Sequence, residues 1–229
     1  METIIVPTDF SKSASKALEF AVMIAQKSYV KVNVSHIIDV PMPGGVNYNT
    51  YHTVKEKAKA DSLAHMQAIH KKYESFLYQR DGEKVIIETD VIINTDLDSI
   101  SQIARQENAF MILMGTHSAS LMEKVLGGTT TTDVLNEASC PVMIVPEEVK
   151  LNNFKKMVYA TDLKNDDEDF FDLLLSFAKY FSSEIECVHV GNDIEKWNED
   201  RAIMDSMQDS YKEIYFRTIG HHSVVEGLN

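Results

Sequence analysis

Residues 114–130 combine the types and spacing that best suit binding chemistry. The stretch holds three glycines, two serines and the start of a run of four threonines, and it has almost no charge. An apolar run, residues 110–114, enters it, and a patterned segment that begins near Thr129 leaves it. A strand that breaks at glycine and restarts as a helix presents backbone N–H groups to phosphate. The stretch therefore predicts a phosphate-binding loop.

Composition restricts the partners that such a loop could serve. The chain has 229 residues, a formal net charge of −13 and a pI near 5.0. Nucleic-acid surfaces need clustered Lys and Arg, so we expect no nucleic-acid partner. No apolar run approaches the ~18 residues of a membrane helix. The first residues contain no basic n-region of a signal peptide. We therefore expect no membrane partner and a cytoplasmic protein.

Few residues suit metal binding or catalysis. Cys140 and Cys187 lack metal-ligand spacing and suggest no disulfide framework. His65 and His70 share a predicted helix, but not at the i, i+4 spacing of a zinc protease. No Ser-His-Asp order or pair of carboxylates in a plausible cleft stands out. We expect neither metal ligands nor catalytic groups.

Short apolar runs alternate with helical patterns through the first two thirds of the chain. The predicted strands are 4–7, 32–38, 85–93, 111–114 and 142–145, and the predicted helices are 14–25, 53–78, 99–106 and 130–136. Wholly apolar strands are typical of a parallel sheet that is buried on both faces. The pattern predicts an α/β domain at 1–147, with a parallel, doubly wound, five-stranded sheet that is flavodoxin-like in the broad sense.

Two features of the predicted helices are more specific. Ser11 or Ser13 is expected to cap the first helix. The second helix has a predicted apolar side made of Leu63, Met66, Ile69, Tyr73, Phe76 and Leu77.

After a polar linker at 148–153, the chain begins the same pattern again. Asp162 lies 153 positions after Asp9, and His189 lies 153 positions after His36. Two landmarks at one offset indicate an internal duplication, although both are short enough to match by chance. Residues 154–229 contain no counterpart of the fourth strand, the glycine–threonine stretch or the last strand. We therefore predict an incomplete second copy.

The motifs resemble those of the universal stress protein family. The family's loop is written as Gly, two residues, Gly, nine residues, Gly, then Ser or Thr. Gly115 matches its first position, Gly128 and Thr129 match its last pair, and Ser118 replaces its second glycine. Further similar segments are 6–11, 114–117 and 140–142. The chain is identified as a tandem member with a truncated second domain and an adenine nucleotide alpha hydrolase-like sheet.

The resemblance implies ATP or AMP in the first domain, with or without Mg²⁺. Asp9 would lie beside the adenosine, and Ile37 would line the adenine pocket. Met114 and Gly115 would approach the base and the ribose. Ligands of open α/β sheets bind outside the carboxyl ends of the strands, which agrees with these positions.

For the phosphates, the resemblance implies donors from Gly128, Thr129 and Thr130. Ser118 would either add a hydroxyl donor or crowd the ribose-phosphate path, because glycine allows a closer backbone approach. The threonine run could also be only a helix start with capping hydroxyls. Likewise, Asp9 could simply cap the first helix.

Three functions stay open. The favoured one is a regulatory stress-response protein that binds a nucleotide, with no enzyme activity. The second is a homodimeric interaction module without nucleotide, which pairs through the strand from Val142 to Val145, as in family dimers, or through the second half. The weakest is a slow ATP hydrolase, for which His117 is the one available base. The second half, with sixteen acidic and eight basic side chains, is expected to bind no ATP.

Overall fold

The computed structural model describes residues 1–40, 45, 47–74, 85–93, 100–116, 129–150, 154–163, 167–191, 196–221 and 223–228. They form two compact units, Met1–Leu151 and Asn152–Asn229, which are treated separately. The division falls within the predicted linker at 148–153. The domain limits 1–147 and 154–229 stay a prediction.

The first unit is a parallel α/β sheet. Its elements are β1 (Glu2–Pro7), α1 (Lys12–Ala25), β2 (Val30–Ile38), α2 (Tyr48–Glu74), β3 (Ile87–Ile93), α3 (Ile100–Gln106), β4 (Ala109–Thr116), α4 (Thr129–Glu137) and β5 (Val142–Pro146). All paired strands are parallel, in the order β3-β2-β1-β4-β5. The predicted five-stranded, doubly wound sheet is confirmed. Flavodoxin itself has the order 2-1-3-4-5, whereas here β1 and β4 are the central neighbours.

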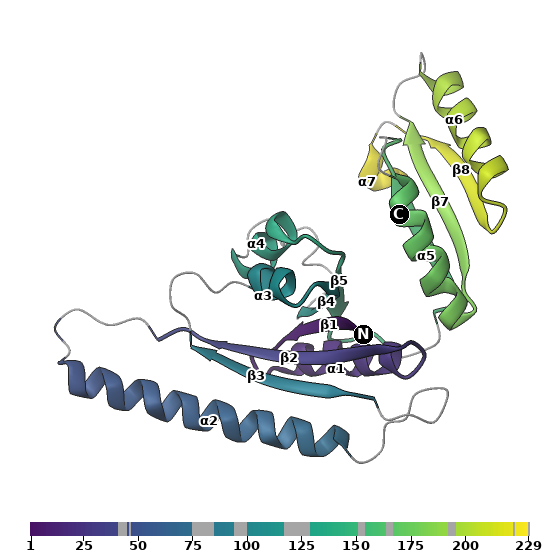
Figure 1. Ribbon diagram of the computed structural model, residues 1–229. Coiled ribbons are helices and arrows are strands. Elements are labelled where there is room, and N and C mark those ends of the chain that lie inside the picture. The colour runs from purple at the N-terminus through teal and green to yellow at the C-terminus, as the bar shows by residue number, and fades with distance from the viewer. Residues whose placement is uncertain are drawn as a thin grey trace. The chain divides into compact units, whose positions relative to one another are not determined.

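Helices cover both faces of this sheet (Figure 1). The helices α1 and α2 lie on one side, and α3 and α4 lie on the other. Right-handed crossovers account for this arrangement, because the chain advances one way from β1 to β3 and the opposite way from β4 to β5. The reversal occurs between β1 and β4.

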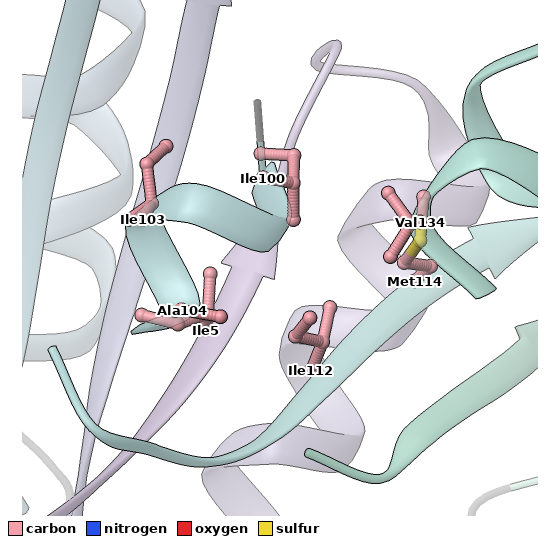
Figure 2. Packing of buried hydrophobic residues seen from close by; sticks show 7 residues of the cluster. All are labelled: Ile5, Ile100, Ile103, Ala104, Ile112, Met114 and Val134. Carbon is pink, nitrogen blue, oxygen red and sulfur yellow. The ribbon is translucent and has the colours of Figure 1, made fainter. Parts of the chain in front are cut away.

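Burial on both faces explains why the middle of β1 and of β4 is wholly apolar. Ile4, Ile5 and Val6 of β1 are each 0% exposed. Side chains on one face join Ile112 and Met114 of β4 and residues of α3 and α4 in a single cluster, shown in Figure 2. The sheet is therefore the rigid centre of the unit, and its loops lie at its ends.

Helix boundaries refine two predictions. Ser11 caps α1, because its Oγ accepts from the Ala14 N–H at 3.2 Å, while Ser13 is buried. The predicted apolar side of α2 is only partly right. Met66 is 2% exposed and Ser62 is also buried, but Leu63 is 42% exposed. The helix contacts the sheet chiefly along β3, an outer strand, so only a narrow side is covered. Residues 76 and 77 lie outside the described part.

The second unit has three parallel strands. Its elements are β6 (Lys156–Thr161), α5 (Asp167–Phe181), β7 (Glu184–Gly191), α6 (Trp197–Ser210), β8 (Ile214–Gly220) and α7 (Val224–Gly227). The strand order is β6-β7-β8. This sheet fits an incomplete second copy. The sequence did not predict α7, a single turn that Ser223 caps through the Glu226 N–H.

Strand register supports the duplication. Pro7 pairs with Ser35 in the first unit, and Thr161 pairs with His189 in the second, so both pairs lie 28 positions apart in the sequence. A one-residue slip would exchange the faces of a strand. The two units thus share the register of their first two strands.

Candidate functional site

The candidate site lies at the carboxyl edge of the first sheet, where β1 and β4 are neighbours and the chain reverses direction. Open α/β sheets bind ligands in the crevice at such a point. Asp9 follows β1 by two residues, Ile37 is the penultimate residue of β2, and Met114 and Gly115 lie among the last three residues of β4. The fold therefore brings these four predicted residues to the same edge.

A tight turn presents Asp9. The Phe10 N–H donates to Thr8 Oγ1 at 3.0 Å, and the Ser11 N–H donates to Asp9 Oδ1 at 2.9 Å. Phe10 has φ of 63°, a left-handed conformation that costs a bulky residue about 1–3 kcal/mol. Asp9 is exposed, and the residue that caps α1 is Ser11. The alternative in which Asp9 is only the helix cap is therefore wrong.

Apolar side chains line the carboxyl edge on one face of the sheet. Met114 is 7% exposed and packs with Ile112 and Val134, as Figure 2 shows. Ile37, which is partly buried, packs against the same cluster. Both residues thus belong to the face that carries α3 and α4. A flat apolar ring would find an apolar surface there.

The backbone of α1 leaves no room for a side chain at Gly115. An ideal Cβ there would lie 2.1 Å from the carbonyl carbon and oxygen of Ser13 and 2.5 Å from Ala14 N. Glycine is therefore required for close helix–strand packing. Gly115 also sets the position of the first turn of α1, which follows the Asp9 turn. Its implied contact with base and ribose stays a prediction.

Two of the predicted phosphate donors begin a helix. Thr129 and Thr130 are the first residues of α4, where backbone N–H groups lack partners within the helix and carry partial positive charge. Because β4 and β5 are parallel, the chain between them leaves β4 at the carboxyl edge, and α4 begins on that side of the sheet. The side chains of Thr129 and Thr130, and all of Ser118 and Gly128, lie outside the described residues. Their roles stay predictions.

Sequence reasoning missed the part that His36 plays at this edge. Its Nδ1 lies 2.6 Å from the carbonyl oxygen of Thr8, in the turn that carries Asp9. The Phe10 ring lies 4.4 Å from the His36 ring and 4.8 Å from the ring of His65 on α2. The contact satisfies the Nδ1 atom of the imidazole within the fold. The spacing shared with His189 was the one signal of this contact.

The described residues give little support for metal binding, for a membrane-spanning helix or for a reactive cysteine. No group of three or more His, Cys, Asp or Glu among them could hold a metal ion. None of their helices is both long and apolar enough to cross a membrane. Cys140 and Cys187 are not joined in a disulfide. Burial raises the pKa of Cys140, which lowers its thiolate fraction and its reactivity.

A separate cavity of about 490 Å³ lies between α2 and β3. Its lining residues are Gln67, His70, Lys71, Ile87, Glu88, Thr89 and Asp90. Two of its carboxylates already have partners, since Lys31 Nζ contacts Glu88 at 2.8 Å and the Asn33 amide donates to Asp90 at 2.8 Å. The cavity begins at the amino end of β3, away from the carboxyl edge.

Comparisons with known proteins extend these observations. A model of the universal stress protein family matches residues 1–146. Universal stress protein MJ0531 of Methanocaldococcus jannaschii is 26% identical over 148 residues, which are 64% of this chain and 83% of that protein. Universal stress protein MJ0577 of the same organism is 23% identical over 157 residues, 62% of this chain and 93% of that protein.

A solved structure resembles both units. The crystal structure of a universal stress protein from Archaeoglobus fulgidus DSM 4304 aligns with 96% of this chain and 78% of its own, with a TM-score of 0.69 and 18% sequence identity. At this identity the likeness shows the fold. The family model covers more than half of the chain, and the fold and the motifs at its carboxyl edge agree with it. The chain belongs to the universal stress protein family.

Proposed function

We propose that this chain binds an adenine nucleotide, ATP or AMP, at the carboxyl edge of its first unit, and that binding serves a regulatory role in a stress response. One observation carries the proposal. The strand order makes β1 and β4 neighbours at the point of reversal, and the predicted residues Asp9, Met114 and Gly115 end or follow those two strands. Such a point is where this fold class holds its ligands.

The charge of the protein is compatible with an anionic ligand. The chain has a formal net charge of −13, yet backbone N–H groups and the N-terminus of α4 attract phosphate without formal charge. Gly128, Thr129 and Thr130 would supply these donors, and Mg²⁺ would offset part of the phosphate charge. The apolar surface formed by Ile37 and Met114 suits the adenine ring.

We assign no nucleotide to the second unit. A Cβ at Gly191 would lie 3.2 Å from Trp197 Cε3, and one at Gly220 would lie 3.2 Å from Trp197 Cζ3. The indole thus packs on both glycines, which end β7 and β8. Its bulk occupies one face of the carboxyl edge of that sheet. The excess of acidic side chains in residues 151–229 adds repulsion.

Calorimetric titration of ATP with Mg²⁺ tests the proposal. The wild-type protein is expected to give saturable heat, and Gly128→Glu is expected to abolish it, because a carboxylate in the loop would repel phosphate. Ser210→Glu adds the same charge at an exposed position of α6 and should bind like the wild type. No heat and no thermal shift at millimolar ATP would exclude nucleotide binding.

Two other functions remain testable in the same preparation. Release of inorganic phosphate above a protein-free blank would support the slow hydrolase. The dimerising module is favoured by β5, which is an outer strand of the sheet with partly buried Val142, Met143 and Ile144. Outer strands present unpaired backbone groups to other chains. A dimer by sedimentation velocity without nucleotide, together with no ATP binding, would support that module.

A cytoplasmic location belongs to the same proposal. Cys140 and Cys187 are not joined in a disulfide, although oxidising compartments favour disulfides. Reduced cysteines agree with a reducing compartment. Fluorescence microscopy of a tagged chain, compared with cell fractionation of the untagged chain, would test the location.

A further inference from the structure

The turn that carries Asp9 is held from three sides. Thr8 N donates to the Ser35 carbonyl oxygen at 2.9 Å, which continues the β1–β2 ladder. The Thr8 hydroxyl oxygen accepts from Phe10 N, and the Thr8 carbonyl oxygen lies 2.6 Å from His36 Nδ1. The third contact comes from a side chain of the neighbouring strand. It reaches past the end of β1 to the first peptide of the turn.

Chemistry fixes the direction of this third bond. A carbonyl oxygen only accepts, so His36 Nδ1 must carry the hydrogen and donate it to Thr8. The imidazole thereby holds the peptide that precedes Asp9. Phe10, which follows Asp9, packs against the same imidazole in a tilted arrangement, at a centroid distance of 4.4 Å. His36 therefore contacts the residues on both sides of Asp9.

The second unit contains the same contact between a histidine and the threonine of the turn. His189 Nδ1 lies 3.0 Å from the Thr161 carbonyl oxygen, and the Leu163 N–H donates to Thr161 Oγ1 at 2.8 Å. Leu163 has φ of 60°, close to the 63° of Phe10. A left-handed bulky residue is costly, and it occurs at the same place in both turns. Each turn is thus shaped by its threonine and its histidine.

The two histidines differ in their remaining contacts. His189 Nε2 lies 3.2 Å from Asp200 Oδ2 on α6. His36 is instead covered by the Phe10 ring, which also stacks on His65 of α2 at 4.8 Å. The shared feature is therefore the bond from Nδ1 to the threonine carbonyl. The first unit alone combines that bond with the predicted nucleotide site.

We propose that His36 is a positioning residue for nucleotide binding, which fixes through Thr8 the backbone from which the Asp9 carboxylate projects. The inference rests on the proposed function of the first unit. A carboxylate that is already oriented loses less conformational entropy when the ligand arrives. Without the bond, the strained turn would sample other conformations, and Asp9 would meet the nucleotide less often in the right orientation.

A pair of polar substitutions separates the bond from simple packing. His36→Asn places an N–H donor where histidine has Nδ1, whereas His36→Gln moves the donor one carbon further along the side chain. By calorimetry, His36→Asn should keep the ATP Kd within about twofold of the wild type, and His36→Gln should weaken it about fivefold to tenfold. His36→Ser, which cannot reach Thr8, should behave like His36→Gln.

The same substitutions in other backgrounds complete the test. With Asp9→Ala, the difference between His36→Asn and His36→Gln should disappear, because the bond acts through Asp9. His189→Asn and His189→Gln alter the matching bond of the second unit and should leave the ATP Kd unchanged.

The results separate a failure of the positioning role of His36 from a failure of the proposed nucleotide binding. A wild-type protein that binds no ATP overturns the proposed function. If the wild type binds ATP, three results overturn the positioning role of His36: equal affinities of the Asn and Gln variants, a difference that persists with Asp9→Ala, or the same difference at His189.

Discussion

At the scale of single residues, Gly115 gives the sharpest test of the packing. In Gly115→Ala, the new methyl group would lie 2.1 Å from the Ser13 carbonyl group, and backbone atoms cannot rotate away. We expect the free energy of unfolding of the first unit to fall by about 3 kcal/mol or more. Urea denaturation followed by circular dichroism would measure this loss.

Gly191→Ala serves as the matched control. Its Cβ would lie 3.2 Å from Trp197 Cε3 and 3.5 Å from Asp200 Oδ2, which are side-chain atoms that can shift. The expected loss in the second unit is about 1 kcal/mol. A Gly115 variant no less stable than this control would show that α1 does not approach β4 as described.

Glu186 predicts an acid dependence of the second unit. Its hydrogen bond from Lys156, with help from Arg217 Nη1 at 3.3 Å, holds the pKa of this carboxyl below its usual value. A lowered pKa in the folded state stabilises the fold above the unfolded pKa, about 4.3, and this contribution is lost as the pH falls through the folded pKa. Glu186→Gln should therefore lose less stability than the wild type on acidification.

The single tryptophan allows the stability of the second unit to be measured as the pH falls. Trp197 lies on α6, so its fluorescence follows the second unit during urea denaturation. Denaturation midpoints from neutral pH to about pH 3 should fall more steeply for the wild type than for Glu186→Gln, across the range in which carboxylates titrate. Glu184→Gln, an exposed change on the same strand, is the control. Parallel curves for wild type and Glu186→Gln would contradict the ion-pair argument.

Apolar runs predicted the strands, and the family resemblance implied which residues reach their carboxyl ends, but neither showed what each residue touches. Asp9 follows β1 and Met114 lies near the end of β4, while their contact with a nucleotide stays a prediction. The contact of Gly115 with Ser13 joins residues about a hundred positions apart in the sequence, and the bond of His36 to Thr8 joins β2 to the turn that follows β1. Such contacts depend on the register and layer order of the sheet, which spacing along one segment does not encode.

At the scale of elements, α2 depends on few buried side chains. Among its described side chains, Met66 is the buried apolar one, at 2% exposure, in a helix of 27 residues. Met66→Ala should lower the free energy of unfolding by about 2–5 kcal/mol through the cavity it leaves. Leu63→Ala, at a position 42% exposed, should change it by about 0.5 kcal/mol or less.

Hydrogen–deuterium exchange would locate the effect of the Met66 change. The amides of α2 should exchange faster in Met66→Ala than in Leu63→Ala, because the helix loses the one apolar side chain that is buried among its described residues. Equal exchange in the two variants would show that other contacts hold α2.

Strands of this protein were easier to predict than helices. Wholly apolar runs bounded by other residue types mark buried parallel strands clearly, as at β1 and β4. The helix α2 begins five residues earlier than predicted, and Leu63, which was predicted on its apolar side, is exposed. The reason is that a polar helix against an outer strand has only a weak hydrophobic periodicity. The one-turn helix α7 contains too few residues for a periodic pattern.

At the scale of the whole molecule, the second unit repeats part of the arrangement of the first, which fits an incomplete second copy. Both units keep the parallel register of their first two strands, the left-handed residue after the Thr-Asp pair and the histidine bond to that threonine. They differ where ligand chemistry would occur. The first unit continues from β4 through the glycine–threonine stretch to α4, whereas the second places Trp197 over the ends of β7 and β8. Two copies of one turn therefore provide an internal control for nucleotide binding.

The most direct test compares Asp9→Ala with Asp162→Ala by calorimetric titration of ATP with Mg²⁺. Both carboxylates are exposed, and each comes directly after the threonine whose carbonyl oxygen contacts the histidine of the neighbouring strand. We predict one ATP per wild-type chain, a Kd about tenfold weaker in Asp9→Ala, and no change in Asp162→Ala. Binding that is unchanged in Asp9→Ala, or weakened equally by both substitutions, would contradict a nucleotide site at the carboxyl edge of the first unit.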